Sequence, residues 1–183
     1  MAALLNTHRP QFNATQQLVA ISLVLIIGRL IPHPWNMTPT LALTLLCGRW
    51  LSQPRAITVA LTTTITSDII LALLQHHPVW GSWSLWTYSA WFGITILGHR
   101  SRTSTLAQHL VLVLSSSLGF WLWTNFGCWL TMGYPLNASG FITCYSLALP
   151  FLSHQLLGDS LWFAACVYAA SPLQRFSLTL AKR

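Results

Sequence analysis

Long apolar stretches separated by short polar gaps dominate this chain, and they are the feature that most restricts its fold. Of its 183 residues, 54% are hydrophobic and only 6% are charged, whereas about 25% charged residues is usual for a soluble domain. A helix needs about 20 largely apolar residues to cross the hydrocarbon layer of a bilayer. We therefore expect an all-α integral membrane protein with a single transmembrane domain over residues 1–183.

Prolines, glycines and basic residues divide the apolar sequence into a bundle of six expected transmembrane helices. Their expected ranges are 17–31, 38–51, 56–75, 84–97, 105–124 and 152–170. Pro150 interrupts the last apolar stretch, so we also expect a half-helix or re-entrant segment over residues 140–149. Several ranges are shorter than a full span, which predicts that some helices are embedded within the bundle.

The basic residues predict the orientation of these helices. Eight of the nine Lys and Arg lie in or beside the termini and two of the connections: Arg9, Arg49, Arg55, Arg100, Arg102, Arg175, Lys182 and Arg183. The other gaps, 32–37, 76–83 and 125–139, contain neither Lys nor Arg. Cationic loops stay on the cytoplasmic side, so we expect a multi-pass membrane protein with both termini inside. The charges form no basic stripe, which favours contacts with the lipid bilayer over binding of nucleic acid.

Three ionisable residues fall at membrane depth. Asp68 and Asp159 are the only acidic residues of the chain, and both lie inside apolar stretches, as does Arg29. At 1.5 Å per residue, Asp68 lies roughly 18 Å from the cytoplasmic end of its helix and Asp159 roughly 10 Å below the outer end of its own. All three can therefore share one layer. Such groups usually mark a functional site, but a structural ion pair remains open; we expect Asp159 to pair with Arg29 and Asp68 to line a polar cavity.

The outer gaps are rich in Trp, Tyr and His, whereas the cytoplasmic gaps contain essentially one Trp, Trp50. An interfacial aromatic belt would appear on both faces, so the asymmetry favours a lid over a ligand. The candidate ligand-binding residues are Arg29, Asp68, His76, His77, Trp80, Trp83, Asn125, Trp129, Tyr134 and Asp159.

No hydrolase, zinc-protease or phosphate-binding motif occurs in the sequence, so we expect no enzymatic activity. Any energy from ATP must then come from a partner. The four cysteines lack the spacing of a metal site, and a disulfide between Cys128 and Cys144 is left open.

Several segments, taken in order, resemble a known family. They are residues 29–39 (RLIPHPWNMTP), 66–71 (TSDIIL), 124–129 (TNFGCW), 134–135 and 144–159. The chain resembles small bacterial membrane proteins related to the substrate-binding S components of energy-coupling-factor vitamin transporters, which include solitary proteins proposed for cobalamin uptake. The resemblance covers residues 29 to about 170. It implies a six-helix bundle in the bacterial cytoplasmic (inner) membrane, with both termini inside and an outward-facing pocket roofed by the first, third and fifth connections.

The resemblance further implies a substrate-binding transport protein for uptake of a small vitamin-type compound, with cobalamin as the first candidate and no cofactor of its own. An energy-coupling ATPase module is the implied partner, although the small-xxx-small docking pattern is absent because Val24 follows Ala20. Some relatives contact cobalt through a cysteine in the third connection; here only His76 or His77 can do so. The alternatives are a membrane scaffold or assembly subunit and a corrinoid-processing membrane protein.

Overall fold

The computed structural model describes residues 14–34, 36–101 and 103–180, and in these ranges it contains six helices and no strand. The all-α fold expected from the sequence is therefore confirmed. Trp35 and four of the basic residues behind the predicted orientation, Arg9, Arg102, Lys182 and Arg183, lie outside the described ranges. The helices are α1 (Ala14–Leu30), α2 (Thr40–Trp50), α3 (Gln53–Gln75), α4 (Ser84–Arg100), α5 (Leu106–Thr131) and α6 (Ala138–Leu180).

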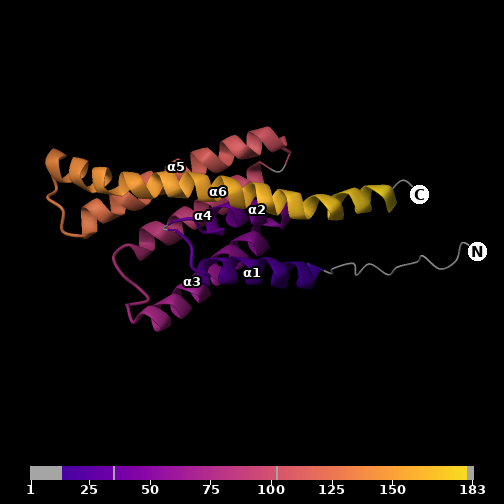
Figure 1. The fold of residues 1–183 in the computed structure, drawn as a ribbon, viewed down its shortest axis with the longest axis horizontal. Helices are drawn as coiled ribbons and strands as arrows, with labels where there is room; N and C mark the ends of the chain where they lie inside the picture. The colour runs from indigo at the N-terminus through magenta and orange to yellow at the C-terminus, as the bar shows by residue number, and fades with distance from the viewer. Residues whose placement is uncertain (1–13, 35, 102, 181–183) are drawn as a thin grey trace, which may run out of the picture.

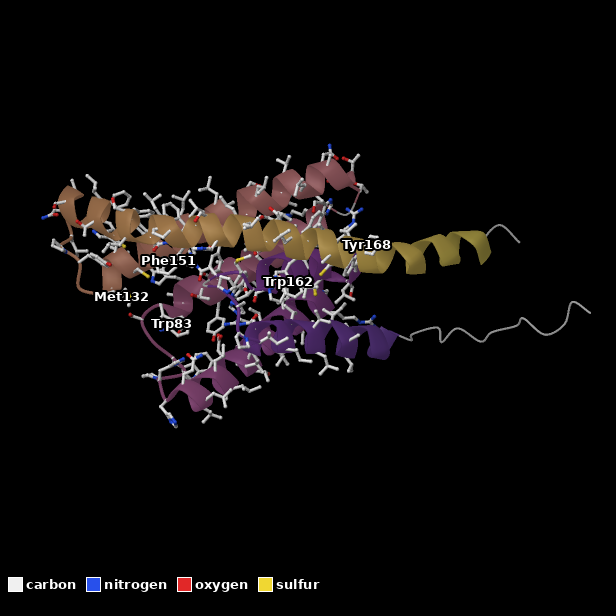
Figure 2. The ribbon with its side chains drawn as sticks, viewed as in Figure 1. Trp83, Met132, Phe151, Trp162 and Tyr168 are labelled. Carbon is white, nitrogen blue, oxygen red and sulfur yellow. The ribbon has the colours of Figure 1, made fainter. Side chains whose placement is uncertain are left out.

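The helix connections gather at two ends of the bundle (Figure 1). The α3–α4 and α5–α6 connections lie at one end, whereas the α4–α5 connection lies at the other, with the start of α1 and the end of α6. Trp83 and Met132 lie toward the first end and Tyr168 toward the second (Figure 2). We call these the α3–α4 end and the α4–α5 end.

The short helix α2 forms the centre of the bundle. Its residues from Thr40 to Gly48 are all buried, and it contacts each of the other five helices. At 1.5 Å per residue, its 11 residues extend only about 16 Å, too little to cross a bilayer unaided. The prediction that a short helix is embedded within the bundle is confirmed for α2. The main core comprises Leu41, Ala42, Leu45, Leu46, Trp91, Ile94, Val113 and Phe163.

Two glycines allow α2 and α4 to pack with their backbones in close contact. A Cβ atom on Gly98 of α4 would overlap the backbone of Leu45, and one on Gly48 of α2 would overlap the carbonyl oxygen of Thr95. Small residues at such crossings are typical of helices that associate without a hydrophobic driving force from water. The chain therefore requires glycine at both positions.

Three predicted helix boundaries are wrong, and one of them is the end of the last helix, which reaches Leu180 instead of residue 170. The last helix does not break at Pro150: α6 is continuous from Ala138 to Leu180, so no separate half-helix precedes it. Proline removes one backbone donor, and the hydrogen bonds on either side maintain the helix. Likewise α5 continues to Thr131 instead of ending near residue 124. The side chains of Thr124, Asn125 and Thr131 donate to backbone carbonyls one turn earlier, so these polar residues are satisfied within a helix.

Apolar side chains cover much of the outside of the bundle as well as its core, and polar residues are buried among them. Large apolar side chains such as Leu73, Leu85 and Val111 are exposed on the outside of the bundle. The buried polar residues are Thr40, Thr44, Thr63, Thr64, Ser67, Asp68, Thr95, His109, Ser116, Ser117, Gln155 and Asp159. Among the described residues, two helical segments, Gln53–Gln75 and Ala107–Thr131, are long and apolar enough to cross a membrane.

Candidate functional site

An ion pair joins α1 to α3. The Nη2 atom of Arg29, in the last turn of α1, donates to Oδ1 of Asp68 at 2.5 Å. The two side chains are 17% and 9% exposed, so water screens their attraction only weakly. The sequence favoured Asp159 as the partner of Arg29, and that expectation is wrong. The packing of α1 against α3 explains the difference, because it brings Asp68 to the end of α1.

Asp159 lies on α6 and is 2% exposed. The Ser117 hydroxyl on α5 donates to its Oδ2 atom at 2.6 Å, and the Gln155 amide donates to the Ser117 carbonyl oxygen at 3.0 Å. Among the described residues the only ion pair within 4.0 Å is Arg29–Asp68. Asp159 therefore has a hydrogen-bond donor but no cationic partner in the described part of the chain.

Two adjoining cavities lie between α2, α4, α5, α6 and the α1–α2 connection. The first has no charged residue in its lining, and we call it the uncharged cavity; its volume is about 220 Å³. The second is lined by Arg29 and Asp159, and we call it the charged cavity; its volume is about 170 Å³. Both are lined by Asn36, Thr87, Phe120 and Gln155, so they are neighbouring parts of one recess. The uncharged cavity adds Trp121, Thr124, Asn125, Ala148 and Phe151. The charged cavity adds Arg29, Thr38, Thr40, Leu41, Trp91 and Asp159.

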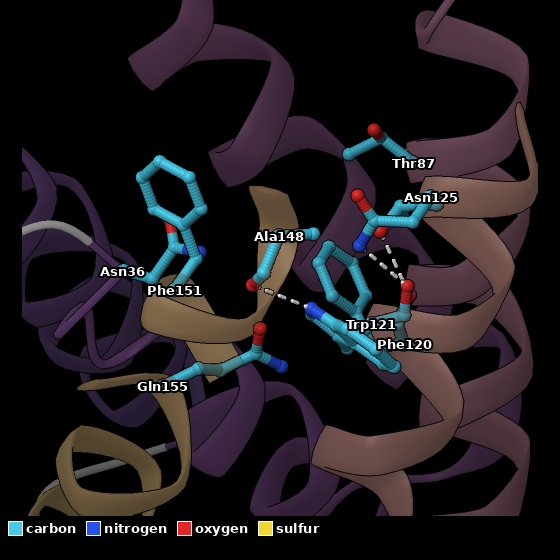
Figure 3. Close-up of a pocket in the computed structure, with 9 residues that line it drawn as sticks. Asn36, Thr87, Phe120, Trp121, Asn125, Ala148, Phe151 and Gln155 are labelled. Atoms are coloured by element: carbon cyan, nitrogen blue, oxygen red, sulfur yellow. Dashed lines mark hydrogen bonds between the residues drawn. The ribbon is translucent and has the colours of Figure 1, made fainter. Parts of the chain in front are cut away.

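Figure 3 shows how the helices form the uncharged cavity. Trp121 on α5 donates its indole N–H to the carbonyl oxygen of Ala148 on α6 at 2.9 Å. Asn125 donates its amide to the Trp121 carbonyl oxygen at 2.8 Å. These bonds fix the positions of two polar side chains on the cavity wall. The arrangement therefore combines flat aromatic surfaces with amide groups, as small-molecule sites commonly do.

The α1–α2 connection forms a further wall. Asn36 adopts a left-handed backbone conformation, φ 62°, which Asn tolerates better than most residues. Trp162 on α6 donates its indole N–H to the Met37 carbonyl oxygen at 3.1 Å. Gly158 lies directly against Met37, where a Cβ atom would overlap its backbone. Because α6 holds residue 37 from two positions, Asn36 is fixed beside the recess.

The structure brings together three of the ten candidate residues at the recess. Arg29 and Asp159 line the charged cavity, and Asn125 lines the uncharged one. Asp68 lines neither cavity, but it binds Arg29. The expectation that Asp68 itself lines the recess is therefore not met. The remaining six residues lie at the α3–α4 end and line neither cavity: His76, His77, Trp80, Trp83, Trp129 and Tyr134.

Four of the six candidates outside the recess have surroundings that can be described. His76 ends α3 in a left-handed conformation, φ 54°, and His77 is exposed beside it. The Trp80 ring lies 5.7 Å from that of Tyr88, measured between centroids. Trp129 lies within α5, not in a connection, and its indole donates to the Pro135 carbonyl oxygen at 3.0 Å. Of these four, Trp80 is linked to the ion pair, because the Tyr88 hydroxyl donates to Oδ2 of Asp68 at 2.7 Å.

Sequence inspection missed several residues of the recess, notably Gln155, Phe120, Thr87 and Asn36. Gln155 had a detectable signal, because it precedes Asp159 by one helical turn within an apolar stretch, which places both on one face. Phe120 and Thr87 had no such signal, since aromatic and threonine residues are common in apolar helices and usually serve packing alone.

A second polar cluster lies at the α4–α5 end. The Arg49 guanidinium donates to the carbonyl oxygens of Ser101 and Ser104 at 3.3 and 3.2 Å, and it lies 3.0 Å from the ring nitrogens of the buried His109. These bonds attach the α4–α5 connection to α2. We interpret this cluster as structural, because main-chain carbonyls take up the guanidinium donors.

The four cysteines are separate thiols. The disulfide left open between Cys128 and Cys144 is not formed; the Cys144 thiol instead donates to the Asn125 carbonyl oxygen at 3.5 Å.

Fold and site together define an all-helical bundle with buried polar and charged residues around a small recess. The chain belongs to the family of unknown function DUF6580, whose family model matches residues 10–179. No curated protein and no solved structure matches the sequence.

Proposed function

We propose that the six helices form one membrane domain in the cytoplasmic membrane of a bacterium. The apolar exterior and the polar residues buried inside the bundle support this proposal, since lipid is the solvent that favours such a distribution. The length of α3 and α5 supports it as well. The shorter α2 does not contact lipid along its length, because it is enclosed by the other helices.

We further propose that the α4–α5 end faces the cytoplasm, with both termini on that side. Arg49 and Arg100 lie at or near this end, whereas residues 76–83 of the α3–α4 connection contain neither Lys nor Arg. The positive-inside rule then assigns the α3–α4 end to the outside.

Within this membrane domain we propose that the recess captures a small compound for uptake. The observation that carries this proposal is the pair of adjoining cavities lined by buried polar groups and aromatic rings. Arg29, Asp159, Gln155 and Asn125 would hold the polar groups of the ligand, and Phe120 and Trp121 its flat surfaces. Trp80, Trp83, His76, His77, Trp129 and Tyr134 would form the outer lid. The resemblance to S components of vitamin transporters supports the same role.

The size of the recess bears on the choice of ligand. Each cavity is smaller than the roughly 300–1,000 Å³ of a typical drug-sized site, and cobalamin is larger still. Cobalamin, the first candidate from the resemblance, would therefore bind only after the outer connections open. We place a compact polar vitamin or similar compound ahead of it. His76 or His77 would supply the cobalt contact in the corrinoid case.

Energy for uptake would come from an ATPase module bound to this chain. The exposed apolar side chains Val19, Leu23, Val24 and Ile27 on α1 offer a surface for such a partner or for lipid. A scaffold subunit without a ligand is the second candidate, and the Arg29–Asp68 ion pair favours it because it joins two helices. Nothing in the recess favours corrinoid processing over binding.

The experiment compares two adjacent substitutions on α6. Ala148 lines the uncharged cavity and is buried, whereas Leu147 is exposed on the outside of the bundle. Ala148→Phe should fill the cavity, and Leu147→Phe adds a ring to the outer face. Small molecules extracted from the purified proteins are identified by mass spectrometry, and uptake of the identified compound is measured in cells. We expect the compound and its uptake to be lost only in Ala148→Phe. Absence of any co-purifying compound from the unaltered protein would support the scaffold, whereas equal uptake by both variants would show that this cavity does not bind the compound.

A further inference from the structure

The charges around the recess do not balance. Asp68 and Asp159 are the only acidic residues of the entire chain, and both lie beside this recess. Arg29 compensates Asp68 directly, through the bond at 2.5 Å. Asp159 is 2% exposed and lines the charged cavity, and among the described residues no cationic group lies within 4.0 Å of it.

We propose that the ligand of this recess is a small organic cation with a flat or aromatic body, bound through Asp159. This inference rests on the proposed function and specifies its ligand class. An ionised carboxylate in an apolar surrounding is costly unless a charge of opposite sign accompanies it. A monovalent cation bound to Asp159 brings the net charge of the recess to zero. Arg29 then compensates Asp68, and the ligand compensates Asp159.

Aromatic rings beside Asp159 suit the same class of ligand. Phe120 lines both cavities and Trp91 the charged one; their rings stack with centroids 4.3 Å apart. The faces of such rings attract cations. Gln155, one turn before Asp159, adds an amide oxygen that can accept from an ammonium or amidinium N–H.

The alternatives leave a charge unbalanced. A neutral ligand would leave an ionised Asp159 without a counter-charge, so it could bind only with Asp159 protonated. An anionic ligand would place a second negative charge near Asp159, and Asp68 already compensates the charge of Arg29 through Nη2, although the buried Nε of Arg29 still lacks an acceptor among the described residues. A zwitterion would leave the net charge as it was. With Asp159 ionised, the charge distribution favours a monovalent cation.

The test uses three probes of the same shape and different charge: benzamidinium, benzamide and benzoate. Binding to the full-length protein in detergent is measured by titration calorimetry and by the shift in melting temperature. We expect benzamidinium to bind about 10-fold more tightly than benzamide, the difference expected for a hydrogen bond to a charged partner, and benzoate not to bind. This comparison uses the unaltered protein, so it does not depend on whether a variant folds.

Two variants locate the binding. Asp159→Asn should abolish the preference for benzamidinium over benzamide, whereas Ser160→Ala, which alters a neighbouring residue bonded to the Leu156 carbonyl oxygen, should retain it. Tighter binding of benzamide or benzoate would overturn the cation proposal but preserve a small-molecule site. No saturable binding of benzamidinium, or binding unaffected in folded Asp159→Asn, would also overturn it.

Discussion

Tyr88 donates its hydroxyl proton to Oδ2 of Asp68 at 2.7 Å, while Arg29 binds the other carboxylate oxygen, Oδ1. One carboxylate thus joins three helices, α1, α3 and α4, beside the charged cavity. The ring of Trp80 in turn lies against Tyr88, so the α3–α4 connection is linked to the same group. Asp68 is therefore the structural member of the acidic pair, and Asp159 is the one available to a ligand.

Asp68→Asn should destabilise the protein. The substitution leaves the Arg29 guanidinium in a poorly hydrated place without a counter-charge, and breaking such a pair costs about 3 kcal/mol of the free energy of unfolding. Thermal unfolding in detergent measures the effect. The double variant Arg29→Gln/Asp68→Asn should lose less stability than the sum of the two single variants, because no charge is left behind. Additive losses would show that the two side chains act independently.

Tyr88→Phe should lower the free energy of unfolding by about 1.5 kcal/mol, since it removes a hydrogen bond to a charged acceptor. Tyr145→Phe is the matched control: its hydroxyl donates at 2.8 Å to the neutral Leu122 carbonyl oxygen. We expect the control to lose about 1 kcal/mol or less. The same unfolding assay ranks the two variants, and an equal or larger loss for Tyr145→Phe would argue against a charged Asp68.

Gly98→Ala should destabilise the α2–α4 packing. Its new Cβ atom would overlap the Leu45 backbone, and forcing two helices apart typically costs about 1–3 kcal/mol. Gly93→Ala on the same helix is the control, because no atom lies within 4 Å of the added Cβ. That substitution should be neutral or stabilise by about 0.5–1 kcal/mol, through lower backbone entropy of the unfolded chain. A stable Gly98→Ala protein would contradict the close approach of these helices.

The sequence predicted the helices better than their contacts. Long apolar stretches identify the six helices because helical hydrogen bonds form between residues that are close together in the sequence. Which carboxylate pairs with Arg29 depends on which helices lie side by side. The depths of Asp68 and Asp159 along their helices do not determine that arrangement. Pro150 and Asn125 were misassigned because both are frequent in connections, whereas an apolar surrounding retains the helix around them.

The aromatic lid has its own test. Replacing Trp80 and Trp83 together by Ala should weaken binding of the compound that co-purifies with the protein by about 2 kcal/mol or more, the loss typical of buried aromatic anchors. Exposed Trp80 contributes little to the packing of the bundle, so the folded fraction should stay unchanged. Size-exclusion profiles and a binding titration measure the two quantities. Unaltered affinity would return both residues to an interfacial role.

Single cysteines, introduced after replacing Cys47, Cys128, Cys144 and Cys166, test the orientation of the bundle. Ser82 and Ser139 lie at the α3–α4 end, and Ser101 follows α4 at the α4–α5 end. If the positive-inside rule governs this chain, a membrane-impermeant thiol reagent should label cysteines at 82 and 139 in intact spheroplasts. A cysteine at 101 should react only after the membrane is permeabilised, which serves as the control for its accessibility. Labelling at 101 alone in intact cells would reverse the orientation and would place the recess on the cytoplasmic side, where it could not serve uptake from outside.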